Sequence, residues 1–124
     1  MQIVCPLVFS RKVLFIYIYI VSLQIKYEMN TKIKNTISDY FKTQPVEKAW
    51  VFGSFSRGEE RLDSDVDILV SLIPGTRLGL RFFAMSLELE QLLNRPVDLV
   101  IEGDILPFAE KTVNKDKILV YARA

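Results

Sequence analysis

The stretch that decides the fold runs from Gly53 to Val70 and reads GSFSRGEERLDSDVDILV. It begins where a predicted strand over 46–52 runs into a Gly-Ser turn, and it ends in a second predicted strand that opens with Asp65 and Asp67. Because strand side chains alternate between faces, both aspartates point to one side, whereas Val66, Ile68 and Val70 point to the other side, into the core. Carboxylates beside apolar residues are costly unless a positive charge offsets them, and paired hard oxygen ligands suit Mg²⁺.

The Gly-Ser turn supplies a second element of the same site. Gly53 lets the backbone approach a ligand closely, and Ser54 can begin a short helix whose free amides favour phosphate. A phosphate-binding turn next to a pair of aspartates indicates chemistry on a nucleoside triphosphate.

The spacing Gly53-Ser54, ten residues, then Asp65-Val66-Asp67 resembles the signature of the minimal nucleotidyltransferases, a family of the DNA polymerase β-like superfamily. The match includes an Arg-Gly pair at 57–58 after the turn and an apolar run at 68–70 after the aspartates. The combination is more specific than a lone DxD motif.

A third carboxylate completes the resemblance. The family carries one on a later strand, and Asp98 lies in that setting within the sequence RPVDLV at 95–100. The resemblance covers roughly 30–121, which is nearly all of the chain except its first residues.

The resemblance implies roles for these residues. Asp65 and Asp67 would bind Mg²⁺ and the triphosphate of ATP, and Asp98 would bind a second Mg²⁺ and help to take the proton from the attacking hydroxyl. Gly53 and Ser54 would hold the β- and γ-phosphates. The reaction implied is in-line attack on the α-phosphorus with release of pyrophosphate, in a two-ion site.

Simpler interpretations of these residues remain open at this stage. Asp65 could cap the turn into the strand, Asp67 could be a solvated strand residue, and Asp98 could be an ordinary exposed acid. Arg57 could bind phosphate through its guanidinium, or it could pair with Glu59 or Glu60 on the surface.

The sequence predicts an α+β fold in which a small mixed sheet has helices packed on one face, the polymerase β-like nucleotidyltransferase fold. Apolar spacing predicts a first helix that begins at Asn30 or Thr31 and ends before Pro45. Buried strand 46–52, a charged loop over 59–63, strand 66–72, crossover helix 77–93, strand 97–101, helix 106–114 and terminal strand 118–121 follow. With the first two strands antiparallel and the third parallel to the second, all three acids reach one edge of the sheet.

The division of the chain is predicted as an N-terminal extension over 1–28 and a minimal nucleotidyltransferase domain over 29–124. The extension contains an apolar run at 13–23, whose eleven residues are too few to cross a bilayer as a helix, which needs about 20. Its composition is compatible with a signal-like segment, with an added strand over 15–20, or with translation from an upstream start codon before Met29. We favour the last of these.

Composition narrows the function further. The 124 residues carry a net charge of +1, which gives no basic field for nucleic acid. There is no histidine, which excludes histidine-based hydrolysis and histidine-ligated zinc. Cys5 is the only cysteine, which fits a reducing cytoplasm, and no membrane partner is expected.

A chain of this length has no room for an acceptor-binding domain, so its acceptor should lie on a partner. The resemblance implies that this partner is a HEPN-domain toxin, an RNase, and that the chain is its antitoxin, moving AMP from ATP to a tyrosine hydroxyl within a hetero-oligomer. Two alternatives stay open. The chain could modify a small antibiotic-like molecule with a companion subunit, or it could neutralise its partner by binding alone.

Overall fold

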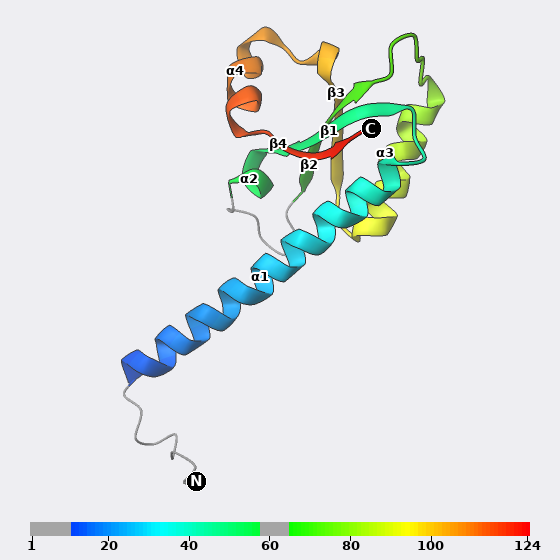
Figure 1. Ribbon diagram of the computed structural model, residues 1–124. Helices are drawn as coiled ribbons and strands as arrows, with labels where there is room; N and C mark the ends of the chain where they lie inside the picture. The colour runs from blue at the N-terminus through cyan, green and yellow to red at the C-terminus, as the bar shows by residue number, and fades with distance from the viewer. Residues whose placement is uncertain (1–10, 58–64) are drawn as a thin grey trace. The chain divides into compact units, whose positions relative to one another are not determined.

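The computed structural model describes residues 11–57 and 65–124 and contains a four-stranded mixed sheet with the strand order β3-β2-β1-β4 (Figure 1). The strands are β1 (Val46–Phe52), β2 (Val66–Leu72), β3 (Val97–Ile101) and β4 (Ile118–Ala122). The helices are α1 (Arg11–Phe41), α2 (Gly53–Ser56), α3 (Leu80–Leu93) and α4 (Pro107–Asp116), with a 3₁₀ turn, η2 (Glu102–Asp104), after β3. The α+β fold class is thus confirmed. The predicted loop over 59–63 lies entirely outside the described residues.

The predicted strand directions are confirmed. Strand β1 pairs antiparallel with β2, and β2 pairs parallel with β3 through the crossover helix α3. The pairing of β4 with the other edge of β1, also antiparallel, was not predicted. Strand β1 therefore lies inside the sheet, and its end at Phe52 meets the beginning of β2 at Asp67.

Strand β2 contributes most to the core, because its side chains are buried on both faces of the sheet. Ile68, Leu69 and Val70 have no exposed surface, as expected for an inner strand with a parallel neighbour. Strand β1 is less buried than predicted: Trp50 and Phe52 are only half-buried. The ammonium of Lys117 lies 4.6 Å from the centroid of the Trp50 ring, so a cation covers that ring where the prediction placed core.

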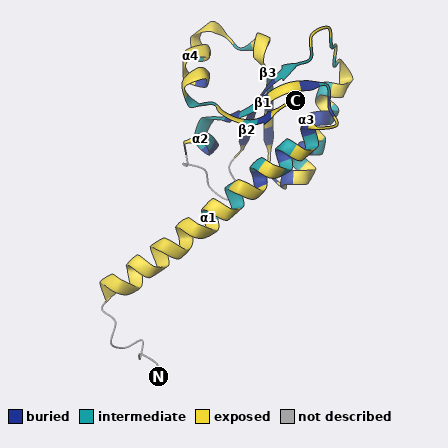
Figure 2. Cartoon of the chain, in the orientation of Figure 1, coloured by how far each residue is buried: buried dark blue, intermediate teal, exposed yellow. Residues whose placement is uncertain are grey.

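Helix α3 packs one stripe of its surface toward the core. Met85, Leu89 and Leu93 are buried at a spacing of four residues, as an amphipathic helix requires (Figure 2). The helix begins three residues later than predicted, after Gly79, and ends at Asn94, whose φ of 54° and ψ of 40° are left-handed. Leu92 of the same helix is exposed, so it lies outside this buried stripe.

Helix α1 contradicts two predictions. It begins at Arg11, not at Asn30 or Thr31, and the Thr31 hydroxyl donates a hydrogen bond to the carbonyl of Tyr27 at 3.0 Å instead of capping a helix. The segment 15–20 is helical, so it is not an added strand. By contacts the chain divides into Met1–Ile33 and Lys34–Ala124. In the first unit the side chains from 11 to 25 are exposed.

Within the second unit, the last turn of α1 is joined to α3 and β4. The Tyr40 hydroxyl donates a hydrogen bond to Glu88 of α3, and the rings of Phe41 and Tyr121 lie 6.2 Å apart. Arg81 donates to Glu88 at 3.1 Å. Among the described residues, no helix has the length and apolar character needed to cross a membrane.

Candidate active site

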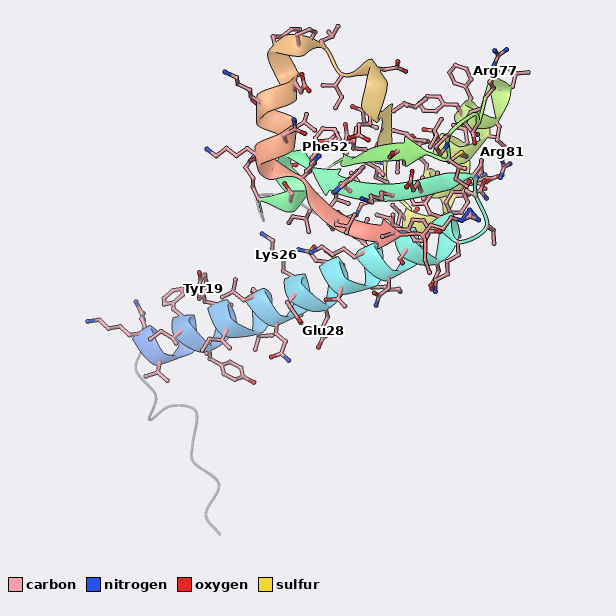
Figure 3. All side chains as sticks on the ribbon, turned by 45° about the horizontal axis from the view of Figure 1, so that its top comes forward. Tyr19, Lys26, Glu28, Phe52, Arg77 and Arg81 are labelled. Atoms are coloured by element: carbon pink, nitrogen blue, oxygen red, sulfur yellow. The ribbon has the colours of Figure 1, made fainter. Side chains whose placement is uncertain are left out.

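Two of the predicted site residues are neighbours on adjacent strands. Asp67 of β2 and Asp98 of β3 are partners in the parallel register, and Asp67 also stands opposite Phe52, the last residue of β1. Asp65 lies one residue before β2 begins. The three acids therefore lie at the edge of the sheet where β1 ends and where β2 and β3 begin, as predicted. In Figure 3 the label of Phe52 marks this end of the sheet, and Arg77 and Arg81 lie at the opposite end.

The pKa of the Asp67 carboxyl is shifted by burial and by the charged side chains around it. Partial burial raises the pKa of the Asp67 carboxyl, and the negative charges of Asp98 and Asp65 raise this pKa further. The guanidinium of Arg57 acts in the opposite direction and lowers it. Asp67 is therefore the focus of a group of three acids and one base, in which negative charge is in excess.

Gly53 is in contact with the same carboxylate. Its φ of +69° favours glycine, and a Cβ built on it would lie 2.2 Å from Oδ2 of Asp67. The sequence predicted that a glycine here allows a close approach to a ligand. The structure adds that a Cβ at this position would displace the Asp67 carboxylate.

Helix α2 is a single turn that places Ser54 and Arg57 beside this edge. The Arg57 amide donates to the carbonyl of Gly53 at 3.3 Å, and the Ser56 hydroxyl donates to the same carbonyl at 2.9 Å. Phe55 is buried and fixes the turn to the core, whereas Ser54 is half-buried. The short helix predicted after Gly53 is thus present.

The side chain of Arg57 has a partner that sequence reasoning missed. Nη1 of Arg57 donates to Oδ2 of Asp116, the last residue of α4, at 2.6 Å. The expected surface partners Glu59 and Glu60 lie outside the described residues. An acid at the end of a helix, where the helix dipole disfavours negative charge, indicates that Asp116 has a partner elsewhere but does not identify Arg57 as that partner.

A cavity of about 320 Å³ lies between α4 and the junction of β1 with α2. Phe52, Gly53 and Arg57 line it from the junction, and α4 contributes residues that include Phe108, Thr112 and Asp116. The Arg57–Asp116 pair thus lies in the wall of a cavity that Gly53 also borders.

The described residues bring Asp65, Asp67 and Asp98 to one end of the sheet but do not form the predicted metal clamp. Over 11–57 and 65–124, no three acidic, histidine or cysteine side chains are grouped closely enough to hold a metal ion. The donor set nevertheless fits Mg²⁺, because it consists of carboxylate oxygens and its excess negative charge would be offset by a cation.

Sequence comparison assigns the family. The sequence model of the nucleotidyltransferase domain family matches residues 31–122, so the chain belongs to this family. A protein of Methanocaldococcus jannaschii that carries the provisional name of protein adenylyltransferase is 37% identical over 90 residues, which are 72% of this chain and 88% of that protein.

Solved structures agree with this assignment. A solved structure whose protein carries the provisional name of minimal nucleotidyltransferase is 31% identical to this chain. It superposes with a TM-score of 0.61 over 75% of this chain and 93% of that one. The chain is also similar, with a TM-score of 0.55 and 19% identity, to a structure described as a tri-AMPylated Shewanella oneidensis HEPN toxin in complex with an MNT antitoxin. That likeness covers 79% of this chain and 73% of the other, and at this identity it shows the fold.

Proposed function

We propose that this chain is a Mg²⁺-dependent protein adenylyltransferase that moves AMP from ATP to a tyrosine hydroxyl of a HEPN-type toxin, and that it acts as the antitoxin of that pair. The observation that carries the proposal is the group around Asp67, where two further acids and Arg57 act on one carboxylate next to the backbone of Gly53. Excess negative charge at such a position is costly for folding alone, so a bound cation explains it better than stability does.

Each residue has a role in the proposed reaction. Asp65, Asp67 and Asp98 would hold Mg²⁺, which when bound neutralises phosphate charge. Gly53 and Ser54 would hold the β- and γ-phosphates of ATP. Arg57 would add its charge to the same phosphates.

The bond changes follow from this placement. The acceptor hydroxyl oxygen forms a bond to the α-phosphorus, the bond from this phosphorus to the oxygen bridging to the β-phosphate breaks, and pyrophosphate leaves. Asp98 accepts the hydroxyl proton, because its side chain is exposed at the beginning of β3 and can meet an acceptor arriving from outside.

The proposed acceptor is supported by the relatives. One structural neighbour is described as an AMPylated HEPN toxin in complex with an MNT antitoxin, and the relative from M. jannaschii carries the name of a protein adenylyltransferase. A hetero-oligomer with the toxin would bring the acceptor tyrosine to the end of the sheet where the three acids lie. We place this activity in the cytoplasm, with no direct role for nucleic acid.

The test is to incubate the purified chain with Mg²⁺, ATP and the HEPN protein encoded beside it, and to measure the intact mass of that partner. We expect a gain of one or more AMP units on tyrosine. Asp65→Asn together with Asp67→Asn should lower the transfer by a factor of at least about 10², since it removes carboxylates that would hold Mg²⁺ at the phosphates, and should leave the complex intact.

The alternatives give different results in the same experiment. A tight complex whose mass never changes would mean an antitoxin that acts by binding alone. Transfer to an aminoglycoside-like hydroxyl without any partner protein would mean a small-molecule nucleotidyltransferase. Either result would contradict the proposal.

A further inference from the structure

The contact between Arg57 and Asp116 joins two segments that are far apart in the sequence. Nη1 of Arg57 lies 2.6 Å from Oδ2 of Asp116, which is 59 residues further along the chain. The Asp116 side chain is 14% exposed and that of Arg57 is 42% exposed, so the acid is the more buried partner.

The position of Asp116 is unfavourable for the helix that carries it. Asp116 is the last residue of α4, where the helix dipole favours cations and disfavours carboxylates. The end of the helix is closed without its side chain, because the Lys117 amide donates to the carbonyl of Val113 at 2.9 Å. Helix formation therefore does not explain an acid here, whereas its contact with Arg57 does.

Stability alone is also a weak explanation of the pair. A partly exposed ion pair contributes at most about 1 kcal/mol to folding. The cation of this pair, however, is the one whose charge acts on Asp67, and it borders the same cavity as Gly53. Whatever fixes the guanidinium of Arg57 therefore fixes a positive charge beside the candidate active site.

We propose that Asp116 is a positioning residue, which holds the guanidinium of Arg57 beside Gly53 and Asp67 so that its charge meets the phosphates of the nucleotide. This inference rests on the proposed function. An arginine side chain loses much rotamer freedom when it is fixed, and a partner that fixes it beforehand lowers that cost at the moment of binding. Asp116 itself need not touch the nucleotide.

Kinetics separate positioning from a purely structural role. We expect Asp116→Ala to raise the KM for ATP about tenfold, equivalent to about 1.4 kcal/mol, with a smaller effect on kcat. Asp116→Asn, which can still accept the hydrogen bond, should restore part of the loss. In an Arg57→Ala background, Asp116→Ala should cause no further change. Glu110→Ala, which removes an exposed acid from the same helix, is the matched control and should leave the KM unchanged.

A second measurement does not depend on any nucleotide. The rate at which phenylglyoxal modifies Arg57, followed by peptide mass, should rise several-fold in Asp116→Ala and stay unchanged in Glu110→Ala. If the wild-type chain transfers no AMP but this rate rises, the proposed function fails while the positioning of Arg57 stands. An unchanged rate, or KM effects of the two substitutions that simply add, would overturn the inference.

Discussion

At the scale of single residues, the site depends on one close approach between backbone and carboxylate. Gly53 has a left-handed φ, and Oδ2 of Asp67 occupies the space that a Cβ on Gly53 would need. Two separate restrictions therefore act on the same position: a conformation that non-glycine residues adopt at a cost of about 1–2 kcal/mol, and a steric one. The second restriction falls on a proposed metal ligand, so it bears on activity as well as on folding.

The substitution Gly53→Ala should therefore damage activity more than stability. We expect AMP transfer to fall by about 10² or more, because the added methyl group displaces the Asp67 carboxylate, with a loss of about 1–3 kcal/mol in the free energy of unfolding. Transfer rates and urea unfolding give the two quantities.

Gly75→Ala is the matched control for this experiment. Gly75 has a φ of +84°, but nothing lies within 4 Å of the Cβ that would be added. It should show the conformational cost without the loss of transfer. Equal losses of transfer in the two variants would contradict the role given to the contact with Asp67.

At the scale of elements, the end of α1 is attached to α3 through Glu88. The Tyr40 hydroxyl and the Arg81 guanidinium both donate to this carboxylate, and Arg81 also donates to Oε1 of Gln44 at 2.7 Å. Burial, and after it the hydrogen bond to Glu88, raises the pKa of Tyr40, and the hydrogen bond from Tyr40 is the main cause of a lowered pKa at Glu88. Arg81 lies at the end of the sheet remote from Phe52, so this network concerns stability rather than chemistry (Figure 3).

Removing the phenol hydroxyl should make this contribution visible as a function of pH. Because the pKa of Glu88 is lower in the folded chain than in the unfolded one, its stabilising effect is present above the unfolded value of about 4.3 and is lost as the pH falls through the folded value. Tyr40→Phe should lower the melting temperature by a few degrees at pH 7, on the order of 2–5 °C. The difference from wild type should shrink below pH ~4.

Thermal unfolding between pH 3 and pH 7 measures this difference, with those limits chosen to bracket the ordinary pKa of glutamate at about 4.3. Tyr27→Phe changes an exposed phenol on the same helix and should have no effect at either pH. A Tyr40→Phe difference that is constant over the whole range would mean that the hydroxyl acts through packing and not through the Glu88 carboxylate.

At the scale of the whole molecule, local signals predicted the sheet well and the contacts between distant segments poorly. Strands β1, β2 and β3 follow from apolar runs bounded by turn residues, and the Gly-Ser turn and Asp67 follow from a motif. The start of α1 was mispredicted because Asn30 and Thr31 can cap a helix only if the residues before them are not helical, and here they are.

The candidate site was predictable in its members but not in its details. Asp67 and Asp98 share a register because the strand order places β2 beside β3. The Asp116 contact joins residues that no local pattern relates, so only the folded chain brings them together. A motif gives the identity of the carboxylates, whereas their spacing depends on the strand pairing.

The most direct test of the central claim, that the acids at this edge hold Mg²⁺ together with a nucleotide, is calorimetric titration of the full chain with AMP-PNP in Mg²⁺ and in EDTA. We expect Mg²⁺ to tighten binding at least about tenfold, or 1.4 kcal/mol, and we expect Asp67→Asn to remove this gain and Glu110→Gln to keep it. If the wild-type chain bound AMP-PNP with equal affinity in Mg²⁺ and in EDTA, the proposed Mg²⁺ site would be contradicted.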